Sequence, residues 1–156
     1  MNFEDKINAI KEKVGQLKKV NNGILSKDEL KEIITKRRVD WIKENLSEML
    51  IKYGNLTPEE QAYKIIFLEH MKINPMHSEI ERISKNKIKI KSYNFCPYLE
   101  ACEILGLETK LICKEIGEPA IQEMIKFINP HLKFSRNYNH IRPYEKFCEE
   151  YIEFIE

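Results

Sequence analysis

Residues 78–95 read SEIERISKNKIKIKSYNF, and this stretch decides the fold class because its pattern differs from that of the rest of the chain. Ile88 and Ile90 fall on one side of an extended chain, and lysines alternate with them. A hydrophobic period of two is typical of a half-buried strand. We therefore predict two strands, at 78–84 and 87–95, joined by a turn at Lys85-Asn86.

Helical patterns flank this hairpin on both sides. Ser26-Lys27-Asp28-Glu29 and Thr57-Pro58-Glu59-Glu60 are capping boxes that begin two helices. In the helix that begins after Ser26, the helical spacing of apolar residues is interrupted at residues 36–38, which predicts a kink or break before Asp40. Three short helices are expected after the hairpin, and a terminal helix is predicted from the spacing of Phe147, Tyr151 and Ile155. The expected fold is α+β: a predominantly helical single domain with a small antiparallel β-hairpin.

Residues 1–22 are expected to form an amphipathic helical arm ahead of the domain at 24–156. Its apolar residues recur at helical spacings of four and three, at Phe3, Ile7, Ile10, Val14 and Leu17. Two interpretations stay open. The stripe packs on its own domain, or it forms the seam of a homodimer.

Composition narrows the function classes. The formal net charge of +1 argues against a protein that coats nucleic acid. RNA binding through Lys85, Lys87, Lys89, Lys91 and Tyr93 is the least favoured function, because a row of alternating lysines is more often the solvent-exposed face of a hairpin.

No apolar run is long enough to cross a membrane, and residues 1–5 do not open a signal peptide, so we expect a cytoplasmic protein without a membrane partner. The Lys and Glu enrichment fits a thermophile, and AT-rich coding is the alternative source of the bias toward Lys, Ile and Asn.

The four cysteines, Cys96, Cys102, Cys113 and Cys148, contain no Cys-x-x-Cys pair, so a zinc-finger signature is absent. Cys102 and Cys148 are expected to be buried packing residues. Cys96 precedes Pro97 and is predicted to cap a helix, where the helix dipole favours a thiolate. This position makes Cys96 a candidate nucleophile or metal ligand.

The segment 134–144, FSRNYNHIRPY, is the most informative polar stretch. If it is extended, Arg136, Tyr138, His140 and Arg142 project from one face. Arginine suits carboxylate or phosphate, and histidine exchanges a proton near neutral pH. We therefore predict that Arg136, Tyr138 and Arg142 bind an anionic substrate and that His140 acts as general acid or base. The alternative is a solvated loop.

A family resemblance rests on the order of short motifs between residues 90 and 152. They are Cys96-Pro97, Leu105-Gly106-Leu107, Cys113, Asn129-Pro130, Leu132, Phe134-Ser135-Arg136 and Cys148-Glu149. Together they resemble the L-2-amino-thiazoline-4-carboxylic acid hydrolase-like family. The resemblance implies hydrolytic ring opening of a cyclic amidine that bears a carboxylate, with Cys96, Cys113, Arg136 and Cys148 at the site. The same cysteine order is distantly similar to zinc-holding domains that sense small molecules.

Two functions follow as expectations. The first is a protein that binds a small anionic molecule and hydrolyses a cyclic C–N bond, with Cys96 and His140 catalytic and no cofactor. The alternative is a zinc-dependent sensor or structural module whose ligands come from Cys96, Cys102, Cys113, Cys148 and His140.

Overall fold

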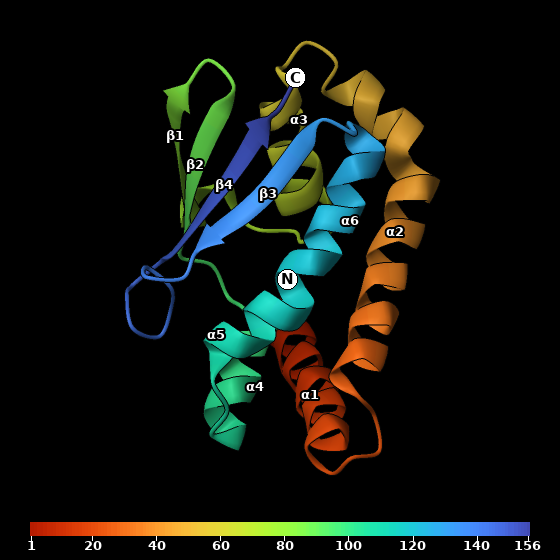
Figure 1. Cartoon of the computed structure of the whole chain (residues 1–156), viewed down its shortest axis with the longest axis vertical. Coiled ribbons are helices and arrows are strands. Elements are labelled where there is room, and N and C mark those ends of the chain that lie inside the picture. Colours follow the sequence, from red (N-terminus) through yellow and green to blue (C-terminus); the bar gives the residue numbers. More distant parts are fainter.

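Helices make up most of the computed structural model, which describes residues 1–156 (Figure 1). The α-helices are α1 (Phe3–Asn21), α2 (Lys27–Lys52), α3 (Pro58–Tyr63), α4 (Pro97–Leu105), α5 (Thr109–Ile112) and α6 (Glu118–Ile128). Two π-helical segments, η1 (Lys64–His70) and η3 (Cys113–Gly117), continue α3 and α5, and η2 (Pro75–His77) is a 3-10 turn. The strands are β1 (Ser78–Ser84), β2 (Lys87–Ser92), β3 (Leu132–Asn137) and β4 (Cys148–Phe154). The predicted α+β, mainly helical class is confirmed.

The predicted helix starts are present, but the predicted break is not. Ser26 and Glu29 form a complete capping box at the start of α2, and Thr57 caps α3 with Pro58 in its first turn. The helix α2 runs unbroken from Lys27 to Lys52, so the expected break before Asp40 is absent. The helical spacing of apolar residues is interrupted because Arg38 occupies the inward position four residues from both Ile34 and Ile42, which are buried.

The hairpin of β1 and β2 is confirmed, and two further strands extend it into a four-stranded antiparallel sheet of order β1-β2-β4-β3. The terminal helix predicted from Phe147, Tyr151 and Ile155 was wrong, because this segment forms β4. A spacing of four is also a multiple of two, so these residues fit one face of a strand equally well. The segment pairs with β2 on one side and with β3 on the other, and this pairing stabilises the strand over the helix.

The inward face of the sheet changes from apolar to polar along its length. The strand register aligns Ile88 with Ile152 and Phe134, and these side chains belong to the core. One step further along the same face, Glu150 lies between Ile90 and Arg136. The last inward pair is Ser92 and Cys148. The outer face carries the lysine row, in which Lys89 lies 3.3 Å from Glu81, and Lys87 and Lys91 lie over the rings of Tyr151 and Phe147.

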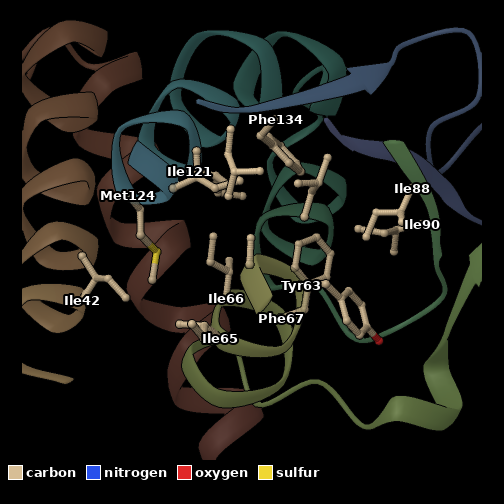
Figure 2. Close-up of a cluster of buried hydrophobic side chains, with 14 of the residues drawn as sticks. Ile42, Tyr63, Ile65, Ile66, Phe67, Ile88, Ile90, Ile121, Met124 and Phe134 are labelled. Atoms are coloured by element: carbon tan, nitrogen blue, oxygen red, sulfur yellow. The ribbon is translucent and has the colours of Figure 1, made fainter. Parts of the chain in front are cut away.

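The larger of two hydrophobic clusters fills the space between the sheet, α6 and the second half of α2. Figure 2 shows its side chains converging from η1, β2, β3, α2 and α6. Ile65, Ile66 and Phe67 are at most 1% exposed, as are Ile121 and Met124. Burial of this set anchors the sheet to the helices through the hydrophobic effect.

The second cluster lies at the other end of the molecule, where α1, α4 and α5 gather (Figure 1). Leu17 of α1 is 1% exposed there, beside Cys102 and Leu30, and Val14 packs against the same cluster. The C-terminal half of the α1 stripe therefore packs on its own chain, whereas Phe3 is 80% exposed. No helix combines the length and apolar character that crossing a membrane requires.

Candidate functional site

A cavity of about 590 Å³ lies between the two hydrophobic clusters. Phe67, Ile73 and Ile121 of the first cluster line one side, and Tyr98 and Ile112 of the second line the other. This volume falls in the range of about 300–1,000 Å³ that is usual for small-molecule sites. The cavity is therefore large enough to receive an organic ligand between the two parts of the core.

Both π-helical segments contribute to this cavity. Phe67 and His70 come from η1, and Cys113 and Gly117 come from η3. Single π-helical turns are rare and occur often at functional sites, because the extra residue turns side chains off the regular α-helical stripe. Here they direct side chains into the cavity from two sides.

The charge of the cavity lining is strongly asymmetric. Its only carboxylate belongs to Glu150, against seven basic side chains: Lys6, Lys13, Arg37, Arg38, Lys72, Arg136 and Arg142. The whole chain is nearly balanced, with 26 basic and 25 acidic residues. The fold therefore concentrates positive charge at one place, which favours an anionic occupant.

Unpaired polar atoms mark the same place. Eight buried side-chain nitrogen or oxygen atoms have no hydrogen-bond partner, and six belong to residues of the cavity lining: Arg38, His70, Ser92, Asn94, Tyr98 and Arg136. Buried polar groups are nearly always hydrogen-bonded, because leaving them unpaired costs about 1–3 kcal/mol each. A polar ligand group would satisfy several of them.

The neighbours of Arg136 belong to β4, η3 and the first residue of α6. Its Nε lies 3.6 Å from Oε2 of Glu150, and its backbone N–H donates to Glu118 at 2.8 Å. Burial is the largest single influence and opposes the charge of Arg136, but the neighbouring groups acting together, Glu150 first among them, raise its pKa. Gly117 leaves room for the guanidinium, since a Cβ at this position would lie 3.4 Å from Nη1.

Arg142 reaches the cavity from the loop between β3 and β4. Its Nη1 donates to the backbone carbonyl of Asn94, and its Nε donates to Sγ of Cys148 at 3.3 Å. These contacts tie the loop to the segment that follows β2 and to the start of β4. Arg142 also sets a positive charge next to one of the cavity thiols.

Three of the four cysteines line the cavity: Cys96, Cys113 and Cys148. Cys96 occupies the N-cap position of α4, as predicted, with Pro97 in the first turn, and its side chain makes no capping hydrogen bond. Burial raises the pKa of Cys113 to about 12, so this thiol stays protonated at neutral pH. Cys102 is fully buried in the second cluster, away from the cavity lining. No group of three or more histidine, cysteine, aspartate or glutamate side chains is arranged to hold a metal ion.

The polar strip after Pro130 does not form a single face. β3 ends at Asn137 and a turn follows, so Arg136 and Arg142 line the cavity, whereas Tyr138 and His140 do not. The side chain of His140 is 46% exposed, and its Nδ1 lies 3.0 Å from Glu145. The histidines that line the cavity are His70 and His77, and burial and Arg38 lower the pKa of His70 to about 4.

Sequence reasoning missed Lys13, Arg38 and His70 as cavity residues. The sequence does mark Arg38 as unusual. The helical spacing of Leu30, Ile34 and Ile42 predicts an apolar residue at position 38, and an arginine occupies it. Lys13 likewise stands four residues before the buried Leu17 and is itself 9% exposed. A charged residue on the inward stripe of an amphipathic helix is a usable sign of a site.

No family model and no curated protein matches the chain. Among solved structures, the fold is similar to that of a trafficking protein particle complex subunit 3 from Naegleria fowleri, which was solved covalently bound to palmitic acid. The TM-score is 0.54, the sequence identity is 14%, and the alignment covers 97% of each chain. At this identity the similarity concerns the fold alone.

Proposed function

We propose that this protein binds an amphiphilic organic acid, an apolar body that carries a carboxylate, in the cavity between the two clusters. The observation that carries the proposal is the lining itself: seven basic side chains and one carboxylate around about 590 Å³. Buried cations without counter-charges are costly, and a bound carboxylate would offset that cost through charge-assisted hydrogen bonds.

The apolar part of the lining supports the same class of ligand. Phe67, Ile73 and Ile121 of the larger cluster present hydrocarbon to the cavity. An apolar chain placed there would continue the core from one cluster into the other. Palmitic acid, the molecule bound to the trafficking complex subunit, belongs to this class and is the natural first probe.

The binding test uses the single tryptophan of the chain. Trp41 lies 4.7 Å, ring centre to ring centre, from His70 of the cavity lining, so its fluorescence should respond to a bound ligand. Octanoate, laurate and palmitate are titrated against the purified protein, with the matched alkyl amines and alcohols as controls. We expect the acids to change the fluorescence and raise the melting temperature, and the amines to do neither. Equal responses to acids and amines would reject the proposal.

Hydrolysis of a cyclic C–N bond stays a second proposal, supported by Cys96 at the N-terminus of α4 and at the cavity wall. Its test is turnover of 2-aminothiazoline-4-carboxylate by the wild type and by Cys96→Ser. Ring opening that the variant loses while it still binds the compound would support a nucleophilic Cys96. Absence of turnover in the wild type would leave ligand binding as the function.

A further inference from the structure

One corner of the cavity lies where α1, α2 and α4 meet, and it is formed by Lys13, Arg38 and Tyr98. The Nζ atom of Lys13 lies 4.8 Å from the centre of the Tyr98 ring. Lys13 and Tyr98 are each 9% exposed, so their polar ends have little access to water.

The polar groups of this corner lack protein partners. The only hydrogen bond of the Lys13 ammonium is a long one of 3.4 Å to Oε1 of Gln16. The Nε of Arg38 and the hydroxyl of Tyr98 are buried without any hydrogen bond. Neither Lys13 nor Arg38 has a carboxylate within ion-pair distance, although charges buried in proteins are normally paired.

The other basic groups of the cavity differ from this corner because the protein supplies them with neighbours. Arg136 faces Glu150, Arg37 pairs with Glu12 at 2.5 Å, Arg142 donates to the carbonyl of Asn94, and Lys6 lies over the ring of Phe95. Lys72 is exposed to solvent. The uncompensated buried charge is thus concentrated at Lys13 and Arg38.

We propose that Lys13, Arg38 and Tyr98 form the head-group site, in which Lys13, Arg38 and the Tyr98 hydroxyl all donate hydrogen bonds to the carboxylate of the ligand. This inference rests on the proposed function and specifies which end of the ligand lies where. The head group would join α1 to α2 and α4, and the apolar body would extend toward Phe67 and Ile121.

The site also predicts a pH dependence of binding. The pKa of Lys13 is lowered to about 8, by burial first and also by Arg37 and Arg38 of α2, whereas Glu12 and Cys96 oppose this shift. Only the protonated amine attracts a carboxylate, so affinity should be highest below about pH 8 and fall as the pH rises above it. A bound carboxylate stabilises the ammonium form and therefore moves this fall to higher pH.

The test is a palmitate titration of the wild type, Lys13→Met, Arg38→Met and Lys13→Arg, with Lys11→Met as the matched control. Lys11 is exposed on the same helix and does not line the cavity. We expect binding to weaken about tenfold or more in the two cavity methionine variants and to stay unchanged in the control. Lys13→Arg should retain binding and lose the fall above about pH 8, because arginine stays protonated.

Thermal unfolding of each variant without ligand shows that it is folded before binding is compared. A wild type that binds none of the acids would reject the proposed function and the head-group site with it. If the wild type binds palmitate and both cavity methionine variants bind it equally tightly, the head-group site is overturned while the proposed function stands. Loss of binding in Lys11→Met to the same degree would also overturn it, because the effect would then not be local to the cavity.

Discussion

The ammonium group of Lys13 on α1 lies 4.8 Å from the centre of the Tyr98 ring on α4, and both side chains are 9% exposed. A cation over an aromatic ring gains about 0.5–2 kcal/mol, which is less than the cost of burying an unpaired charge. The ammonium group of Lys13 therefore destabilises the ligand-free protein, although it lies at the contact between α1 and α4.

Lys13→Met should stabilise the protein without ligand below about pH 8. Between about pH 8, the folded pKa, and 10.5, the ordinary value, only the unfolded chain holds the proton, so the free energy of unfolding of the wild type rises with pH. The Lys13→Met variant lacks this pH dependence, and its free energy of unfolding should exceed that of the wild type by about 3 kcal/mol at neutral pH. Chemical denaturation at neutral and alkaline pH measures this free energy, with Lys11→Met as control. Parallel pH profiles of wild type and Lys13→Met would contradict the prediction.

His70→Phe should remove part of the acid sensitivity of the fold. The pKa of His70 is lowered from 6.5 to about 4, by burial first and Arg38 second. As the pH falls from 6.5 toward 4, the unfolded chain gains a proton that the folded chain does not, so stability falls by about 3 kcal/mol. Phenylalanine keeps a ring against Trp41 and should flatten this part of the profile. The exposed His77 offers the control variant His77→Gln, whose acid profile should follow the wild type.

Glu150→Gln should destabilise the protein and at the same time strengthen carboxylate binding. Glu150 is 4% exposed, and it is the charged partner of Arg136, so its removal leaves a buried guanidinium without a counter-charge, at a cost of roughly 3 kcal/mol. The same change removes the one negative charge of the cavity lining. Denaturation and palmitate titration measure the two effects. Glu153→Gln, in the same strand but outside the cavity lining, should show neither, and weaker binding in Glu150→Gln would refute the charge argument.

Thiol labelling should separate the four cysteines. The thiolate is the reactive form, so Cys113, whose pKa burial raises to about 12, should react slowly with iodoacetamide at neutral pH. Cys102 is fully buried and should not react in the folded protein. Cys96 and Cys148 are partly exposed at the cavity and should react first, and bound palmitate should slow both. Peptide mapping by mass spectrometry identifies the sites, and labelling of Cys113 before Cys96 would contradict this order.

The local signals of the sequence gave correct predictions where short-range physics dominates. The capping box at Ser26 and the alternation around Ile88 act within a few residues, and both features are present in the structure. The predicted N-cap position of Cys96 holds for the same reason, since Pro97 fixes the first turn of α4.

Nonlocal pairing explains the errors. The segment of Phe147, Tyr151 and Ile155 has a pattern that both a helix and a strand satisfy, and only the neighbouring strands β2 and β3 decide between them. The turn after Asn137 likewise separates Arg136 and Arg142 from Tyr138 and His140, which an extended segment would have kept on one face.

By itself, the sequence determined that the chain is an α+β domain rich in helix and where most helices begin, and it marked Cys96, Arg136 and Arg142 as candidate site residues. Only the tertiary structure decided that these three meet Lys13 and Arg38 around one cavity between two separate hydrophobic clusters. Periodicity and capping depend on neighbours along the chain, whereas a cavity depends on which buried faces meet. The cavity lining combines residues of α1, α2, β4 and the loop of Arg142, which are far apart in sequence, and no local pattern encodes this arrangement.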